Sequence, residues 1–145
     1  MMDRLSTVQR SKLMSRIKGR GTSPELVVRS IVQGLGFKHC LHLNSLPGSP
    51  DIVIKEVATV IFVHGCFWHR HSCPRGKSQP STRASFWTAK FDQNVRRDRR
   101  VVRKLRESGW SVMIIWECKT TFTKRPQLER RLFRNLHSRP RTINP

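Results

Sequence analysis

The apolar residues of this 145-residue chain change their spacing several times, and these changes restrict the fold more than any other feature. Helical spacing follows Thr22-Ser-Pro-Glu25, a capping box with proline in the first turn, and ends near Gly36. Alternating or continuous apolar runs then predict three strands, over 37–43, 51–56 and 58–63. The following segment, 64–80, has no sustained period and predicts a loop.

The second half of the chain returns to helical spacing. Basic helices are predicted over 85–91 and 94–107, and Gly109 ends the second. The apolar run 110–116 predicts a strand that we expect to be buried on both faces and therefore central. A last basic helix is predicted over 126–137. Because the last strand follows a helical crossover, this order predicts an α/β fold with a mixed sheet.

The charge balance narrows the class of partner. Lys and Arg total 29 against 9 Asp and Glu, a net charge of +20, which is best neutralised by a polyanion such as nucleic acid. Seven Phe and four Trp argue against a disordered basic tail. Apolar stretches are too short for a membrane helix, and no secretory signal is visible. We expect one domain over 1–145, a cytosolic monomer with no membrane partner.

Cysteine and histidine spacing indicates a metal site within the predicted loop. Cys66, His71 and Cys73 lie within eight residues, and Cys118 follows the last strand as a distant fourth. Three thiols and one imidazole form a closed tetrahedral set for structural zinc, which would order the loop. The alternative is that Cys118 is a buried thiol beside a solvated loop, and spacing alone does not decide. Cys40 is expected in the core.

Acidic and histidine residues near this loop indicate a hydrolytic site. Asp51 opens a strand after a Gly/Pro turn and offers a carboxylate to a hard cation such as Mg²⁺. His64 and His69 are candidate proton acceptors near neutral pH. Glu25 and Asp98 are further candidates. The alternatives are a turn residue for Asp51, a helix cap for Glu25 and an intrahelical ion pair for Asp98.

Several motifs together carry a resemblance to a known family. They occur in order along the chain: Gly65-Cys-Phe-Trp-His69, Phe86-Trp87, Asn94-Val-Arg-Arg-Asp98, Gly109-Trp110 and Ile115-Trp-Glu-Cys118. From about Thr7 to Cys118 the chain resembles the very short patch repair (Vsr) endonucleases. The resemblance implies a restriction-endonuclease-like mixed sheet flanked by helices, with the metal-binding acid at Pro50-Asp51. The Glu-x-Lys of the wider superfamily is missing, and Phe62-Val-His64 stands there, a departure that the repair family shares.

The resemblance also implies an activity and its residues. Members nick DNA on the 5′ side of the thymine in T:G mismatches, which arise by deamination of 5-methylcytosine. By position, Asp51 and the main-chain carbonyl of Val63 would hold Mg²⁺, and His69 would be the general base. His64, Glu25 and Asp98 would complete the catalytic site. Structural zinc would be held by Cys66, His71, Cys73 and Cys118.

The same comparison implies how mismatched double-stranded DNA is held. Phe67, Trp68 and Trp87 would form an aromatic wedge beside the mismatch, with Met14 entering from the opposite groove. The basic segment 1–20 would clamp the duplex. The resemblance fades beyond Cys118. From charge, phosphates would be contacted by the basic C-terminal helix and tail over 119–145 and by three residues of the basic helix, Arg96, Arg97 and Arg100.

The alternatives for these residues are structural. The aromatic residues would otherwise pack in the core, but we expect at least one of Phe67 and Trp68 to be exposed, and Trp110 and Trp116 to be buried. The basic helix would otherwise present a solvated face, although opposite charges are too few to balance it. The sequence leaves open whether mismatch-repair proteins also bind.

Two functions remain after this comparison. The first is a Mg²⁺-dependent nickase, and the second is a zinc-stabilised nucleic-acid-binding protein without catalysis. The relative position of Asp51 and His69 separates them, because a protein that only binds has no need of a carboxylate and an imidazole in one site. If these two side chains lie on opposite sides of the molecule, the catalytic interpretation is wrong.

Overall fold

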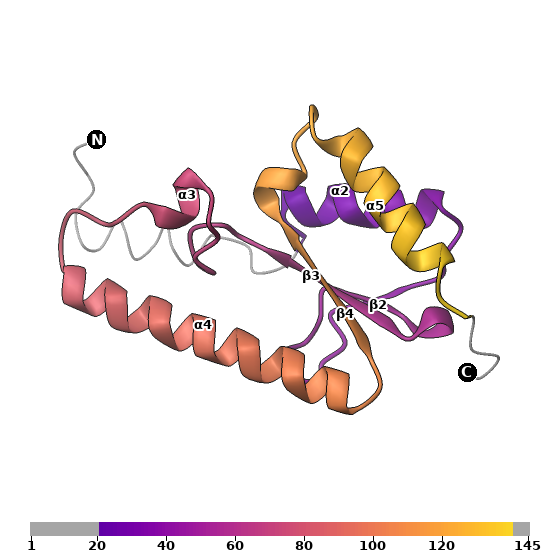
Figure 1. Ribbon diagram of the computed structural model, residues 1–145, viewed down its shortest axis with the longest axis horizontal. Helices are drawn as coiled ribbons and strands as arrows, with labels where there is room; N and C mark the ends of the chain where they lie inside the picture. The colour runs from indigo at the N-terminus through magenta and orange to yellow at the C-terminus, as the bar shows by residue number, and fades with distance from the viewer. Residues whose placement is uncertain (1–20, 141–145) are drawn as a thin grey trace.

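The computed structural model describes residues 21–140 (Figure 1). Segment 1–20, which includes Met14, and residues 141–145 lie outside the described residues. The elements are, in order, α2 Ser23–Gly34, β1 Cys40–Leu41, β2 Ile52–Ile54, a 3-10 turn Lys55–Val57, β3 Thr59–His64, α3 Pro74–Lys77, α4 Ala84–Glu107, β4 Ser111–Trp116, a 3-10 turn Glu117–Lys119 and α5 Arg125–His137.

The four strands form one mixed sheet in the order β1-β2-β3-β4. β1 with β2 and β2 with β3 are antiparallel, whereas β3 and β4 are parallel and are joined through α4. In Figure 1, α2 and α5 lie together on one side of the sheet and α4 runs along the other. The predicted α/β class with a mixed sheet flanked by helices is therefore confirmed.

Strand alternation places one apolar cluster on each face of the sheet. On the α2 and α5 face, Ile61 and Ile115 pack with Val32 and with Leu132, all fully buried or nearly so. On the α4 face, Val53, Val60 and Phe62 pack against Leu105. Neighbouring residues of a strand point to opposite faces, so both layers come from the same strands.

The expectation that strand 110–116 is central was wrong. β4 pairs only with β3 among the described residues and lies at the edge of the sheet. Its side chains alternate between buried and half-buried, because helices cover both faces even at the edge. The Arg131 guanidinium donates to the carbonyl of Ile114 at 3.3 Å and so occupies one polar group near that edge.

The two helices predicted over 85–91 and 94–107 are one continuous helix, α4. Neither residue 92 nor residue 93 is a glycine or proline that would interrupt the helix. Asn94 is buried within it and donates from Nδ2 to the carbonyl of Trp68 at 3.1 Å. A long helix results, and Figure 1 shows it reaching beyond the sheet to the loop that carries α3. Within 21–140 no helix combines the length and apolar character that crossing a bilayer requires.

Candidate functional site

Asp51 immediately precedes β2 and its carboxylate faces the neighbouring strand. Asp51 Oδ2 accepts a hydrogen bond of 2.7 Å from the main-chain N–H of Val63 on β3. Burial raises the pKa of Asp51 to about 6, and the charge of Glu25 acts in the same direction. Asp51 is therefore a partly buried carboxylate fixed to the sheet, and not only a turn residue.

Glu25 is linked to Asp51 by His42, which contacts Glu25 through one ring nitrogen and faces Asp51 with the other. Thr22 caps α2 by accepting from the main-chain N–H of Glu25, as the capping box predicts. The Glu25 side chain is only 2% exposed, and its Oε2 faces both the main-chain N–H of Gly21 at 3.1 Å and Nε2 of His42 at 3.2 Å. Glu25 therefore belongs both to the capped first turn of α2 and to the candidate site.

His42 is the residue that sequence reasoning missed. Its Nδ1 lies 3.8 Å from Oδ1 of Asp51, while its Nε2 contacts Glu25. The predicted strand 37–43 ends early, at Leu41, and His42 adopts a left-handed backbone conformation with φ of 49°. Proximity to Pro50-Asp51 could not be read from the sequence, because it depends on the pairing of β1 with β2.

A second cluster contains His64, His69 and Asp98. His69 Nδ1 and Asp98 Oδ2 are 2.6 Å apart, so Asp98 pairs with the loop histidine rather than with an arginine of its own helix. The His64 ring stacks on the His69 ring at 3.8 Å between centroids, with an angle of 7° between planes. Burial lowers the pKa of His64 to about 4, so this ring is neutral near neutral pH.

The two clusters face one cavity. A cavity of about 380 Å³ is lined by residues of both, including Asp51, His42, His69 and Asp98. A neighbouring cavity also has Glu25, Asp51 and His69 in its walls. Asp51 and His69 therefore lie on the same side of the molecule. The arrangement that would contradict the catalytic interpretation, with the two side chains on opposite sides, is not found.

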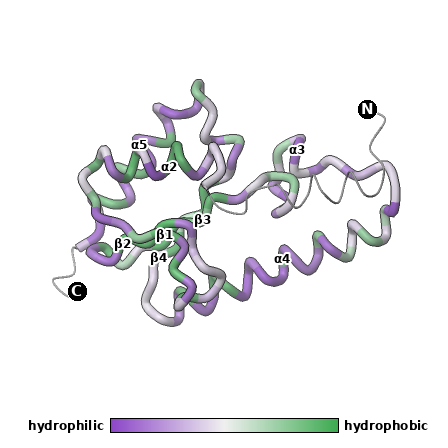
Figure 2. The backbone as a smooth tube through the Cα atoms, turned by 180° about the vertical axis from the view of Figure 1, so that it is seen from behind, coloured by the Kyte–Doolittle hydropathy of each residue, from purple (hydrophilic) through white to green (hydrophobic). Residues whose placement is uncertain are grey.

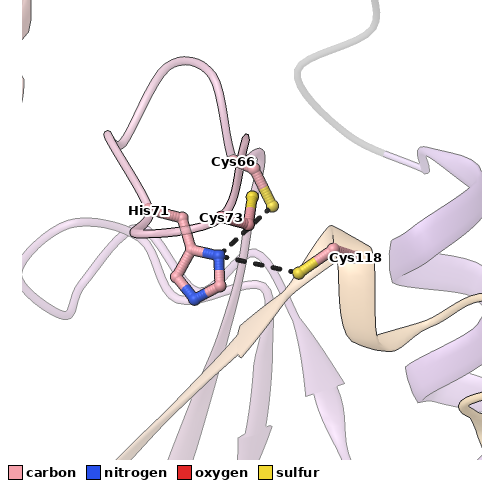
Figure 3. A group of neighbouring side chains, drawn as sticks. All are labelled: Cys66, His71, Cys73 and Cys118. Carbon is pink, nitrogen blue, oxygen red and sulfur yellow. Dashed lines mark hydrogen bonds between the residues drawn. The ribbon is translucent and has the colours of Figure 1, made fainter. Parts of the chain in front are cut away.

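The third cluster unites the four predicted zinc ligands (Figure 3). Cys66, His71 and Cys73 come from the loop after β3, and Cys118 follows β4. His71 Nδ1 lies 3.8 Å from Cys66 Sγ and 3.6 Å from Cys118 Sγ, and the four ligand atoms lie within 4.8 Å of one another. Ligands of one tetrahedral zinc, at about 2.0–2.3 Å from the ion, are separated by about 3.6–3.8 Å. The donor set and its spacing fit zinc.

Contacts around these ligands fix the loop in its position. Glu117 Oε1 accepts from the main-chain N–H of Cys66 at 2.9 Å and also pairs with Arg75 at 3.5 Å. A Cβ at Gly76 would lie 1.9 Å from the carbonyl oxygen of His71, so only glycine permits this close approach. The N–H of Gly76 lowers the pKa of Cys73 to about 6, whereas burial raises that of Cys66 to about 12. Cys40 lies apart and packs against the apolar cluster on the α4 face, as expected.

The predicted wedge residues form one aromatic cluster between the loop and α4. The Phe67 ring meets those of Trp68 and Phe91 at 5.1 Å and that of Trp87 at 6.2 Å. Phe91 is buried, while the three wedge residues are half-buried. The expected exposure of Phe67 or Trp68 is therefore found only in part, because the rings cover one another. They lie outside both core clusters.

The remaining predicted residues are placed less uniformly. Arg96, Arg97 and Arg100 are exposed on α4, which Figure 2 colours as mainly hydrophilic, and Arg97 also lines the cavity with Asp51. Trp110 and Trp116 are half-buried rather than fully buried. Trp116 stacks on His71 at 4.3 Å and meets His64 edge-on at 5.4 Å, so it touches two of the clusters.

Comparisons with known proteins find relatives over most of the chain. The family model described as DNA mismatch endonuclease Vsr matches residues 2–75. A DNA mismatch endonuclease Vsr of Escherichia coli K12 is 46% identical over 118 residues, covering 81% of the chain and 75% of that protein. The type II nicking enzyme V.XorIIP of Xanthomonas oryzae pv. oryzae is 42% identical over 118 residues, covering 81% and 86%. The type II nicking enzyme V.NmeAIP of Neisseria meningitidis is 37% identical over 118 residues, covering 81% and 84%.

Proposed function

The chain belongs to the Vsr family of DNA mismatch endonucleases, and from this membership we propose that it nicks double-stranded DNA on the 5′ side of the thymine in a T:G mismatch. The reaction is Mg²⁺-dependent hydrolysis of one phosphodiester bond, at the lesion left by deamination of 5-methylcytosine. One observation supports the catalytic part most directly: the Asp51 carboxylate and the His69–Asp98 pair line a single cavity.

Two metal ions are part of this proposal. Oδ2 of Asp51 accepts from the N–H of Val63, whereas Oδ1 faces Nδ1 of His42 at 3.8 Å. A hard carboxylate oxygen in the wall of a cavity of about 380 Å³ fits Mg²⁺, with the main-chain carbonyl of Val63, which lines the same cavity, as the neighbouring ligand. Mg²⁺ supplies charge neutralisation to the phosphate oxygens when it is bound. Zinc is proposed at the cysteine and histidine cluster, where it is structural.

His69 is proposed as the general base. Its Nδ1 is engaged by Asp98, so the N–H points at the carboxylate and the lone pair of Nε2 is available to a water molecule. The water oxygen forms a bond to phosphorus, its proton passes to Nε2, and the bond from phosphorus to one deoxyribose oxygen breaks. That deoxyribose oxygen keeps the electron pair of the bond and becomes a hydroxyl by taking a proton from solvent water. Asp98 then stabilises the imidazolium, and the stacked His64 ring keeps the plane of His69 fixed.

The aromatic cluster is proposed as the mismatch reader. Phe67, Trp68 and Trp87 are held together on one side of the loop and are supported by Phe91 and by the guanidinium of Arg70, 4.1 Å from the Phe91 ring centroid. Wedge insertion costs a few kcal/mol of unstacking per base step, and a mismatched step resists less than a paired one. Selectivity for T:G would begin with this difference.

The test is a nicking assay on matched duplexes. Duplexes with a T:G, T:A or C:G pair at one position, labelled on either strand, are incubated with the protein after dialysis against Mg²⁺-free buffer and again after Mg²⁺ is restored. Dialysis without chelator leaves structural zinc in place. We expect one nick, 5′ of the thymine, only with T:G and only with Mg²⁺. Tight, salt-sensitive binding with no nick in any flanking context would instead support the zinc-stabilised binding protein.

A further inference from the structure

We propose that His42 is a ligand of the same metal ion as Asp51, and that this nitrogen ligand makes the site bind Mn²⁺ more tightly than Mg²⁺. The inference rests on the proposed function for the site at Asp51 and adds a residue to it. Glu25 is a positioning residue in this arrangement, because it acts on the ion through His42. The ligand atoms of Glu25, His42 and Asp51 all lie within 4.8 Å of one another.

The hydrogen bond to Glu25 fixes which nitrogen of His42 is available. A carboxylate oxygen can only accept, so the 3.2 Å contact between His42 Nε2 and Glu25 Oε2 requires the proton on Nε2. Glu25 is 2% exposed and also accepts from the N–H of Gly21, so its position is held from two sides. In neutral imidazole the lone pair then lies on Nδ1, the atom that faces Asp51.

The space between His42 and Asp51 has the dimension of a shared ion. Nδ1 and Asp51 Oδ1 are 3.8 Å apart, which is beyond hydrogen-bond length, and both atoms carry lone pairs. Two ligands about 2.1 Å from one ion lie between roughly 3.0 Å apart at a right angle and 4.2 Å apart when opposite. A cation between the two atoms removes the repulsion of facing lone pairs and satisfies both.

The main chain holds these two ligands in register. The N–H of His42 donates to the carbonyl of Asp51 at 3.2 Å, directly beyond the β1–β2 pairing. The other oxygen of Asp51 is tied to Val63 at 2.7 Å, so Oδ1 is the oxygen left to face His42. A metal-binding histidine is usually oriented by a carboxylate on its other ring nitrogen, and Glu25 takes that position on His42.

A nitrogen ligand changes which ion the site prefers. Mg²⁺ favours oxygen ligands and keeps several waters, whereas imidazole suits ions of the first transition series. Mn²⁺ accepts the same octahedral oxygen set and tolerates an imidazole in it. The preference for Mn²⁺ is thus a property of the cluster of Glu25, His42 and Asp51. It does not come from the proposed zinc cluster, whose four ligand atoms belong to other residues.

The experiment measures Mn²⁺ on the intact, zinc-loaded protein without DNA. Electron spin-echo envelope modulation detects a nitrogen directly bound to Mn²⁺, and ¹⁵N-labelled histidine identifies it as imidazole. We expect a coupled nitrogen in the unsubstituted protein and its loss in His42→Gln. Titration of the free Mn²⁺ signal should show binding weakened about tenfold or more in that variant. Competition should show Mn²⁺ bound more tightly than Mg²⁺ in the unsubstituted protein and this margin reduced in the variant.

A matched control lies three residues earlier. His39→Gln removes a half-buried histidine whose Nδ1 contacts the carbonyl of Phe37, away from the cluster, and should leave both signals unchanged. Should His42→Gln fail to fold, broadening of the His42 ring resonances by Mn²⁺ in the unsubstituted protein replaces it. Absence of coupled nitrogen, or coupling that survives in His42→Gln and so comes from His64 or His69, would overturn the inference.

The outcome is separable from that of the proposed function. A protein that nicks T:G duplexes but shows no His42 coupling keeps the function and loses this ligand. A protein that shows the coupling and nicks nothing keeps the ligand and loses the function. Equal affinity for Mn²⁺ and Mg²⁺ would contradict the metal preference even if the nitrogen is bound.

Discussion

Two clusters near the C-terminal end of β3, the thiol cluster (Cys66, His71, Cys73 and Cys118) and the carboxylate cluster (Glu25, His42 and Asp51), are built in opposite ways. Three of the four thiol-cluster ligands, Cys66, His71 and Cys73, come from one loop of eight residues. Glu25, His42 and Asp51 each come from a different part of the chain, and their cluster adjoins a cavity. A set of four protein ligands closes a metal site, whereas fewer ligands leave positions for substrate or water.

The difference between the clusters bears on how the loop positions His69, the proposed general base. His69 lies between two thiol-cluster ligands in the sequence, and its N–H bonds to the carbonyl of Gly65 at 3.1 Å. Ordering the loop at Cys66, His71 and Cys73 therefore also fixes the ring that faces Asp98. In the proposed mechanism, the thiol cluster holds the loop in place and the carboxylate cluster leaves a position open for substrate or water.

The largest effect is expected from breaking the closed cluster. Cys73→Ser removes a thiolate ligand, and structural zinc contributes on the order of 10 kcal/mol to folding small sites. We expect zinc content to fall from about one per chain to near zero, with loss of nicking and a fall in the unfolding midpoint of more than about 10 °C. Metal analysis and thermal unfolding measure this. Cys40→Ser, outside the cluster, is the control, and an equal loss of zinc there would contradict the assignment.

A substitution in the carboxylate cluster should lower activity without affecting stability. Asp51→Ala removes the carboxylate proposed to bind Mg²⁺ but no packing of the loop, so nicking should fall by about 10³ or more while the unfolding midpoint and duplex binding change little. Nicking rates and binding to a T:G duplex are measured side by side. Full activity in Asp51→Ala would mean that the site is misplaced.

How much of this was visible in the sequence differs between the two clusters. All four residues of the thiol cluster were named from their spacing, because three of them are local. Spacing alone left a buried thiol at Cys118 as an equal alternative, and the family resemblance favoured the zinc set. In the carboxylate cluster Asp51 and Glu25 were identified, but His42 was not. Its position depends on β1–β2 pairing and on an early strand end, neither of which leaves a periodic pattern.

The errors in the fold have a similar origin. Apolar run 110–116 predicts a strand correctly, but the position of β4 at the edge follows from pairing partners, not from its own residues. The sequence prediction began a new helix at Asn94, but this residue lies within α4. It is buried because its side chain donates to the carbonyl of Trp68 in another segment. Local periodicity predicts elements well, and contacts between distant segments decide their surroundings.

The next effect tests the partner of the general base. Asp98→Asn replaces the acceptor that faces Nδ1 of His69, and loss of that orientation should lower the nicking rate by about 10²–10⁴. Single-turnover rates at saturating enzyme separate this from weaker binding. Asp92→Asn, on an exposed position of the same helix, is the control. Comparable losses in both variants would indicate a general effect of charge on α4.

A smaller effect is expected in the aromatic cluster. Trp68→Ala removes one of three wedge rings, and base stacking is worth about 1–3 kcal/mol per ring. Binding to T:G should weaken about five- to a hundredfold, and more than binding to T:A, because only a deformed step accepts the wedge. Trp110→Phe, which keeps a ring on the α4 face of the sheet, should change neither. A uniform loss on both duplexes would remove Trp68 from mismatch reading.

The smallest effect concerns affinity without selectivity. Arg97 is exposed on α4 and lines the cavity with Asp51, so we expect it to contact a phosphate near the nick. Arg97→Gln should reduce the slope of log affinity against log salt by about 0.9, the value of one phosphate contact, and weaken T:G and T:A duplexes equally. Lys55 is exposed and follows β2 at the end of the strand away from Asp51. Lys55→Gln should therefore leave the slope unchanged. If Arg97→Gln instead discriminates between the two duplexes, the arginine takes part in recognition, and the division between a reading cluster and a phosphate-binding helix does not hold.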